Sequence, residues 1–174
     1  DFNRPHGLYH YAELSRLRTH WHSAFKMSQN LSHQLALQLA PQDTYTFESF
    51  CWGPHLLLRD QLLRLGTTQP HELFFYVWGE DGVGKSHLLQ ACCLQASVAE
   101  AAVYLPLKLL KTGGVGVLEG LSQQSLVALD DLDAIAGDAA WEEALFCLMN
   151  EIRQRGKPYL LLIGRESPAA IPIR

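Results

Sequence analysis

Apolar residues occur along this chain in two alternating patterns, short continuous runs and longer amphipathic segments. Four continuous runs have the length of a strand, and they lie at residues 73–78, 102–107, 126–129 and 159–163. Between them, apolar residues return every three or four positions, as they do on one face of a helix. Strands that alternate with helices predict an α/β fold built on a parallel sheet.

Helical spacing is clearest in three segments. Leucines share one side of residues 56–65, apolar residues recur from Lys85 to Ala96, and an amphipathic stretch extends over residues 141–153. Gly156 follows the last of these and is a typical helix terminator. The glycine-rich stretch at residues 113–116 is expected to be a flexible connection.

The loop after the first run matches the phosphate-loop pattern Gly-x-x-x-x-Gly-Lys-Ser/Thr. Glycines let backbone N–H groups approach polyphosphate closely, and the following helix points its positive end at the same anion. Lys85 adds a cation, and the Ser86 hydroxyl can bind Mg²⁺. The residues expected to bind a nucleotide are Gly79, Glu80, Asp81, Gly82, Val83, Gly84, Lys85, Ser86 and His87. An ordinary glycine-rich turn is the less favoured alternative.

The third run ends in two adjacent carboxylates. Acidic residues at the carboxyl end of a buried parallel strand lie at the edge of the sheet where ligands bind. Asp130 is expected to hold the hydrated Mg²⁺ of a nucleotide together with Ser86, and Asp131 is the candidate catalytic residue that polarises the attacking water. Either acid alone would be an ordinary solvated strand end, whereas the pair combined with a phosphate loop favours the functional interpretation.

Aromatic residues are concentrated at residues 45–53, before the phosphate loop. They could line an adenine pocket, but for any single residue simple core packing is the favoured interpretation. The four cysteines lack the spacing of a zinc site, and Cys51, Cys92, Cys93 and Cys147 are expected to be small buried hydrophobes in a reducing compartment.

The composition argues against two classes of protein, those with a surface devoted to nucleic acid and those that span a membrane. A net charge of −4 argues against a surface devoted to nucleic acid, which would normally be basic. No apolar run reaches the roughly 18 residues of a membrane span, and no signal-peptide pattern is present, so a cytoplasmic protein is expected.

The N-terminal part differs from the rest. Residues 1–26 contain four of the eight histidines, and a change of character at Met27 suggests that they are a non-native or upstream extension. Residues 27–44 are expected to be an extended segment. Within it, Gln34, Leu35, Leu37 and Leu39 form a leucine-rich peptide that could dock into a groove on a partner or pack on its own domain, and the residues alone leave these alternatives even.

These motifs together resemble the AAA+ ATPase module of the DnaA family of replication initiators, and within it the Hda group of regulatory proteins. The resemblance covers about residues 31–174, and residues 45–174 correspond to a partial nucleotide-binding domain. It implies a sheet with strand order 5-1-4-3-2, of which four strands are present. The motifs that carry it are Thr46–Phe50, Gly79–Ser86, Tyr104–Leu107, Leu129–Asp131, Ile135–Asp138 and Asn150.

The resemblance implies a negative regulator of replication initiation. Proteins of the Hda group bind the sliding clamp of the replicative polymerase through a Gln-Leu-x-Leu-x-Leu peptide, which Gln34, Leu35, Leu37 and Leu39 match. The clamp-bound protein then stimulates hydrolysis of the ATP on DnaA through an arginine presented in trans. The implied cofactors are ADP or ATP with Mg²⁺. No specific DNA contact and no membrane partner is expected, and self-association stays an open alternative.

Two departures from the family pattern change this picture. Arg165 stands after the fourth run, where the family often has an Asp that senses the terminal phosphate, so intrinsic ATPase activity is expected to be weak or absent. The chain also stops before the family's arginine finger, fifth strand and lid, and is therefore expected to be a fragment. A self-sufficient P-loop ATPase of the DnaA or helicase-loader type is the alternative function, and a small-molecule kinase is less favoured because the doubled acids suit hydrolysis.

Overall fold

A four-stranded parallel sheet forms the centre of the molecule, in the order β1-β4-β3-β2. The computed structural model describes residues 44–65, 72–97, 101–157 and 159–171. The strands are β1 (Phe74–Trp78), β2 (Ala102–Pro106), β3 (Leu126–Asp130) and β4 (Tyr159–Gly164). The predicted fold class is therefore confirmed, and the order of the four strands is the one that the resemblance implies.

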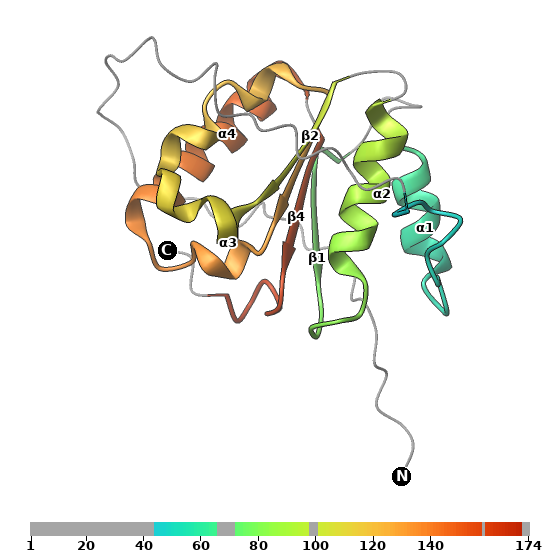
Figure 1. Ribbon diagram of the computed structural model, residues 1–174. Coiled ribbons are helices and arrows are strands. Elements are labelled where there is room, and N and C mark those ends of the chain that lie inside the picture. The colour runs from blue at the N-terminus through green and yellow to red at the C-terminus, as the bar shows by residue number, and fades with distance from the viewer. Residues whose placement is uncertain (1–43, 66–71, 98–100, 158, 172–174) are drawn as a thin grey trace.

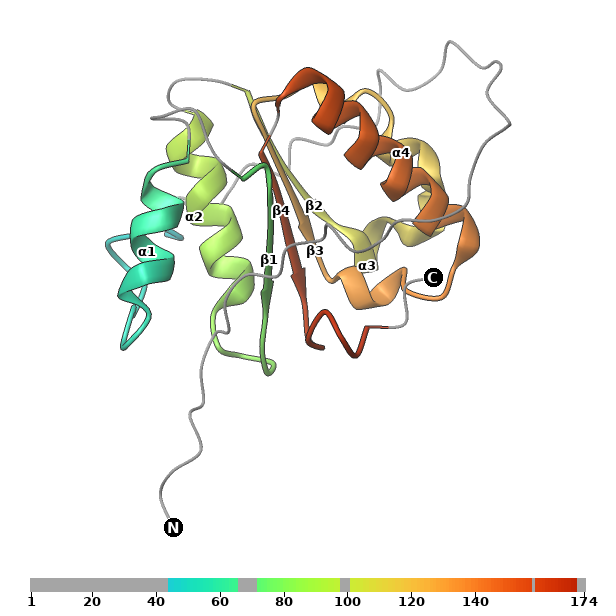
Figure 2. The ribbon, with the colours of Figure 1, turned by 180° about the vertical axis from the view of Figure 1, so that it is seen from behind.

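Helices cover both faces of the sheet, so the domain has three layers (Figures 1 and 2). The helices α1 (Leu56–Leu63) and α2 (Lys85–Ser97) lie on one face. The short helix α3 (Leu107–Leu110) and the long helix α4 (Ala139–Arg155) lie on the other. This arrangement explains why the strands are continuous apolar runs: all five residues of β3 and five of the six in β4 are buried.

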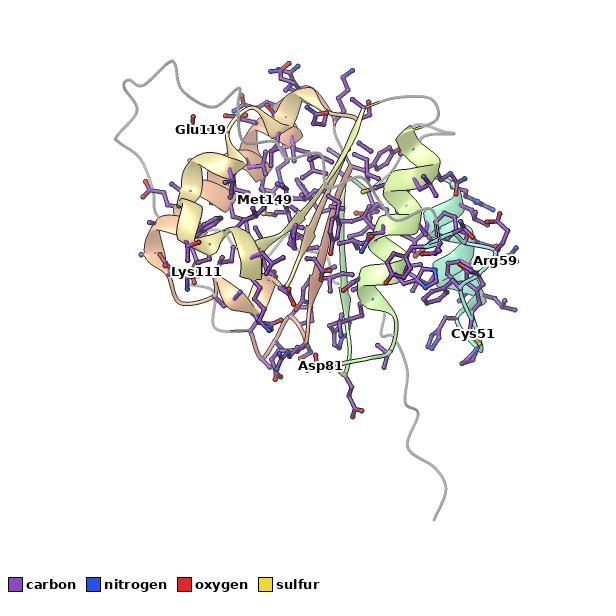
Figure 3. The ribbon with its side chains drawn as sticks, in the orientation of Figure 1. Cys51, Arg59, Asp81, Lys111, Glu119 and Met149 are labelled. Atoms are coloured by element: carbon purple, nitrogen blue, oxygen red, sulfur yellow. The ribbon has the colours of Figure 1, made fainter. Side chains whose placement is uncertain are left out.

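Two apolar cores follow from the layers, and side chains fill the space on each side of the sheet (Figure 3). Trp141, Leu145 and Ile152 of α4 pack on one face. Leu58 and Leu62 of α1 pack with α2 on the other. Among the described residues, no helix is both long enough and apolar enough to cross a bilayer.

The connections differ from the prediction at the glycine-rich stretch. Instead of a flexible link, short 3-10 helices run through it: η2 (Lys111–Gly113) and η3 (Val115–Leu118), followed by η4 (Leu121–Gln123). Leu118 and Leu121 are buried in the core that α4 covers, and these anchors hold the segment in place. Helix α4 extends two residues beyond the predicted range at each end, and Gly156 terminates it with φ 69°.

The cysteines divide into two pairs. Cys92 and Cys93 on α2 are buried, as expected, and burial raises the pKa of the Cys93 thiol to about 12. The expectation is wrong for Cys51 and Cys147, which are exposed. Cys147 belongs to α4, but it lies on a face of the helix that turns away from the core.

The register of the sheet brings distant residues to one edge. Trp78 pairs with Gly164 at the ends of β1 and β4, and Pro106 pairs with Asp130 at the ends of β2 and β3. The phosphate loop, the acidic strand end and the segment after β4 therefore emerge side by side. In open parallel sheets this carboxyl edge is where ligands bind.

Candidate functional site

The glycine-rich loop connects β1 directly to α2, so its conformation depends on Gly84. Gly84 has φ +93°, a left-handed conformation that residues with a Cβ rarely adopt. A Cβ at this position would also lie 2.9 Å from Cε2 of the buried Phe50 ring. Glycine is therefore needed at position 84 for two separate physical reasons, the backbone conformation and the space.

The Lys85 ammonium group points back into its own loop. It donates hydrogen bonds to the carbonyl oxygens of Gly79 (2.8 Å) and Glu80 (2.7 Å), and the residue is only 9% exposed. A buried cation needs such partners. The loop thus folds around a positive charge, which an entering anion could also contact.

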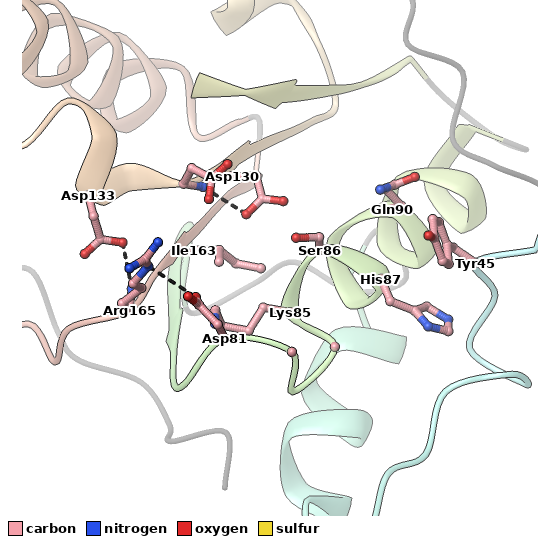
Figure 4. A pocket seen from close by; sticks show the side chains of 14 residues that line it. Tyr45, Asp81, Lys85, Ser86, His87, Gln90, Asp130, Asp133, Ile163 and Arg165 are labelled. Carbon is pink, nitrogen blue, oxygen red and sulfur yellow. Dashed lines mark hydrogen bonds and ion pairs between the residues drawn. The ribbon is translucent and has the colours of Figure 1, made fainter. Parts of the chain in front are cut away.

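A cleft of about 300 Å³ opens at the carboxyl edge of the sheet (Figure 4). It lies between the phosphate loop, the first turns of α2, the end of β3 and the end of β4. The residues that line it are Tyr45, Asp81, Gly82, Gly84, Lys85, Ser86, His87, Gln90, Asp130, Asp131, Asp133, Ile163, Gly164 and Arg165.

Of the residues predicted to bind nucleotide or metal or to act in catalysis, all but three line this cleft. Gly79 and Glu80 act instead through the carbonyl groups that hold Lys85. Val83 is half-buried and packs against the apolar core beside α2. The structure thus brings Lys85, Ser86 and the acidic end of β3 to one cavity.

Asp130 is nearly completely buried, and each of its carboxylate oxygens accepts one hydrogen bond. The Tyr104 hydroxyl donates to its Oδ2 at 2.8 Å, and the backbone N–H of Asp131 donates to its Oδ1 at 2.9 Å. Burial and the nearby Asp130 carboxylate raise the pKa of Tyr104, which keeps the phenol protonated as a donor. Tyr104 is a site residue that the sequence motifs did not identify as such.

Asp131 has φ 57° and ψ 47°, and among the described residues it is the only non-glycine residue with positive φ. Asn and Asp are among the few residues besides glycine that adopt this conformation readily. Burial raises the pKa of the Asp131 carboxyl, the charge of Asp130 adds to the rise, and Lys108 and Arg165 oppose it. A more basic carboxylate at the wall of the cleft is suited to accepting a proton.

Ser86 and Asp130 provide oxygen ligands of the kind that Mg²⁺ prefers. Each carboxylate oxygen of Asp130 has a second lone pair beyond its hydrogen bond, so a water of a hydrated ion can still be held. No group of three or more His, Cys, Asp or Glu side chains suited to a metal occurs in the described part of the chain. The residues therefore fit an ion that is held mainly by phosphate and water.

Six residues that line the cleft were not among the predicted site residues: Tyr45, Gln90, Asp133, Ile163, Gly164 and Arg165. Of these, Arg165 had been related to the site through the resemblance, and Tyr45 only as part of the aromatic stretch at residues 45–53. Arg165 Nε lies 3.2 Å from Asp81 Oδ1, and the Arg165 backbone N–H donates to Asp133 Oδ2 at 2.7 Å. Gly164 has no room for a Cβ, because the Tyr76 hydroxyl occupies that position. The sequence signal that could have identified Asp133 is its position, three residues after the acidic end of β3.

The aromatic segment before the loop contributes both to the core and to the wall of the cleft. Phe50 is buried and packs edge-on against Trp52, with ring centroids 4.7 Å apart, which is core packing. Tyr45 instead lines the cleft, and its ring centroid lies 4.9 Å from that of His87. His87 is held by the segment, with Nε2 3.0 Å from the carbonyl oxygen of Thr46.

The predicted partner-binding residues Gln34, Leu35, Leu37 and Leu39 lie outside the residues that the structure describes, as do residues 1–26. The docking of the leucine peptide therefore stays a prediction.

Comparison with known proteins gives sequence relatives and structural neighbours. No protein-family model matches the chain. An uncharacterized protein of Haemophilus influenzae is 39% identical over 145 residues, which cover 83% of this chain and 62% of that protein. The chain thus spans about three fifths of the length of this curated relative.

The similar solved structures include DnaA structures. AMPPCP-bound DnaA from Aquifex aeolicus has a TM-score of 0.63 at 21% identity, covering 77% of this chain and 45% of that one. Domain III of DnaA from Thermotoga maritima has a TM-score of 0.57 at 22% identity, covering 74% and 59%. The chain therefore shares the fold of DnaA domain III over the part that it covers.

Proposed function

We propose that this chain is the nucleotide-binding part of an AAA+ regulator that limits replication initiation. The observation that supports it best is the convergence of Lys85, Ser86 and Asp130 on one cleft at the carboxyl edge of the sheet. The fold shared with DnaA domain III and the leucine peptide upstream are the further support.

Within this proposal, each residue of the cleft has a defined task toward ADP or ATP. Lys85 and the backbone N–H groups at the start of α2 neutralise phosphate charge, with Gly79 to Gly84 shaping the loop. Ser86 and Asp130 would hold Mg²⁺, which stabilises negative charge on the phosphates. His87 lies one residue beyond Ser86 and packs against Tyr45 at the other end of the cleft.

The regulatory role depends on the N-terminal peptide. Gln34, Leu35, Leu37 and Leu39 would dock as an extended segment into a hydrophobic groove of the sliding clamp. Tethered there in the cytoplasm, the full-length protein would engage DnaA and stimulate hydrolysis of the ATP that DnaA carries, by presenting an arginine to that ATP in trans.

A self-sufficient ATPase is the second candidate, and Asp131 is the observation in its favour. Its carboxyl lines the cleft and has a raised pKa, both of which suit a general base. Arg165 favours the regulator instead. Its charge near Asp131 lowers the basicity of that carboxylate, so the intrinsic hydrolysis of the chain should be weak.

The first experiment is capture of the full-length protein on immobilised sliding clamp, with ADP, ATP or no nucleotide present. The Leu37→Ala/Leu39→Ala variant should lose binding. Leu57→Ala is the matched control, because Leu57 is an exposed leucine on α1 outside the cleft. Equal capture of the double variant and the wild type would refute clamp tethering.

The second experiment separates the two candidates. The regulator predicts that ATP bound to DnaA is hydrolysed faster when protein and clamp are both present, and that the leucine variant loses this effect. The self-sufficient ATPase predicts turnover without DnaA or clamp, unchanged by the leucine substitutions and abolished by Asp131→Asn.

A further inference from the structure

Residues 44–50, which we call the strap, are held against α2 by the side chain of His87. The Nε2 atom of His87 lies 3.0 Å from the carbonyl oxygen of Thr46 and 3.2 Å from Oγ of Ser49. Because a carbonyl oxygen can only accept hydrogen bonds, Nε2 is the donor toward Thr46. The His87 ring also lies against the ring of Tyr45 (Figure 4). One side chain of α2 thus contacts the strap through both a ring nitrogen and the ring itself.

The strap is a closed turn with one buried anchor. Ser49 Oγ lies 2.9 Å from the carbonyl oxygen of Thr44, and the Thr46 N–H donates to the same Oγ at 3.1 Å. Phe50 is buried beside Gly84 of the phosphate loop, whereas the remaining strap residues are exposed or half-buried. A segment with so little buried surface can open locally while the rest of the fold stays intact. The contacts with His87 therefore weigh heavily in keeping the strap closed.

The strap forms part of the wall at one end of the cleft. Tyr45 is the strap residue that lines the cleft, and His87 and Gln90 line the same end (Figure 4). Lys85 and Ser86 lie in the middle of the cleft (Figure 4). If phosphates occupy the loop, the nucleoside extends toward Tyr45. The strap would then meet the nucleoside rather than the phosphates.

We propose that the strap closes on a bound nucleoside and that its release from His87 sets the rate at which nucleotide leaves the cleft. This inference rests on the proposed nucleotide binding. A ligand held by a closed segment leaves only after the segment opens, so each interaction that keeps the segment closed slows dissociation. Ser49 does not line the cleft, so it acts on the ligand only through the strap and is a positioning residue.

The strap predicts faster release of nucleotide without a matching loss of association. Ser49→Ala removes the hydroxyl that closes the turn and contacts His87, and His87→Phe removes the donor but keeps an aromatic ring. Each variant should speed ADP release about three- to tenfold, as expected for one or two lost hydrogen bonds, and change the association rate less than about twofold.

Two further variants test whether these residues act through one shared contact. Because Ser49→Ala and His87→Phe break the same contact, the double variant should release ADP little faster than either single variant. His87→Gln keeps an N–H donor and should release ADP nearly as slowly as the wild type. Simple destabilisation of the domain would instead make the effects of the two single substitutions add.

The test follows radiolabelled ADP, bound with Mg²⁺ to the full-length protein, after excess unlabelled ADP is added. Calorimetry measures the affinities for ADP and for inorganic pyrophosphate. Because pyrophosphate has no nucleoside, Ser49→Ala and His87→Phe should leave its affinity within about twofold of the wild-type value. His55→Phe and Ser125→Ala are the matched controls, because both residues are half-buried and lie outside the strap and the cleft.

The outcomes separate this inference from the proposed function. A wild-type protein that does not bind ADP refutes nucleotide binding, and the role of the strap with it. A wild type that binds ADP but releases it no more slowly than Ser49→Ala and His87→Phe overturns only the strap. Equal losses of ADP and pyrophosphate affinity in these variants also overturn it, because they indicate a damaged phosphate loop. If Ser49→Ala fails to fold, equal release rates for His87→Phe and His87→Gln contradict the strap.

Discussion

The hydroxyl group of Tyr104, in the middle of β2, donates a 2.8 Å hydrogen bond to Oδ2 of Asp130 at the end of the adjacent strand β3. Asp130 is only 3% exposed, so water cannot easily replace this donor. The contact orients the carboxylate that is the candidate Mg²⁺ ligand. Tyr104 is therefore a positioning residue of the cleft, and we expect both the stability of the fold and the Mg²⁺ dependence of nucleotide binding to depend on it.

Substituting Tyr104 by Phe should lower the free energy of unfolding by about 1–3 kcal/mol, because it leaves a buried carboxylate oxygen without its donor. Urea denaturation measures this change. Tyr45→Phe is the control, since the ring of Tyr45 and not its hydroxyl makes the contact with His87. The same loss in both variants would contradict a special role for the Tyr104 hydroxyl. The Mg²⁺ dependence of nucleotide binding should change only in Tyr104→Phe.

Substituting Gly84 by Ala should destabilise the fold by roughly 1–3 kcal/mol, because it combines an unfavourable left-handed backbone with a collision with Phe50. Thermal unfolding measures the change, and nucleotide binding should be lost. Gly116→Ala is the matched control, because its nearest contact would be 3.9 Å away, an ordinary van der Waals distance. A Gly84→Ala protein as stable as this control would show that the loop has room to adapt.

The raised pKa of Asp131 predicts a specific pH dependence of stability. Because the folded-state pKa lies above the ordinary value of 3.8, the folded chain binds this proton more tightly than the unfolded chain. The contribution of Asp131 to the free energy of unfolding therefore falls as pH rises above 3.8 and through the folded pKa. Asp131→Asn should remove that part of the fall, as measured by urea denaturation at several pH values.

The choice of Asn separates charge from backbone conformation. Asn tolerates the left-handed conformation of Asp131 about as well as Asp does, whereas Ala should cost roughly 1–2 kcal/mol there. Asp131→Ala should thus be less stable than Asp131→Asn at every pH. A pH profile for Asp131→Asn identical to that of the wild type would show that this carboxyl is not perturbed.

The four cysteines should react with a thiol reagent in a fixed order at pH 8. Cys51 should react first, followed by Cys147, whose pKa is raised by partial burial and by Glu143 and Glu151. Cys92 and Cys93 are buried, and burial raises the pKa of both thiols, so they should react only after unfolding. Counting released thionitrobenzoate with and without denaturant tests this. Four fast thiols in the native protein would contradict the packing of α2.

The local motifs could be predicted from the sequence because their chemistry lies in contiguous residues. Eight residues from Gly79 to Ser86 suffice for the loop, since strand, glycines and helix follow one another directly. Asp130 could be predicted for a similar reason, because an acid that ends a buried apolar strand must lie at the edge of the sheet. The 3-10 helices around Gly114 were missed, because the buried anchors that hold them lie beyond the glycine-rich stretch itself.

By itself, the sequence determined the α/β class, the phosphate loop and the acidic strand end, because periodicity and spacing act over short distances along the chain. Only the tertiary structure decided that Arg165 faces Asp81, that Tyr104 holds Asp130 and that Tyr76 fills the space beside Gly164. The physical reason is the parallel sheet. Its register aligns the carboxyl ends of strands that are far apart in sequence, and which side chains meet there depends on strand order, which no local pattern encodes.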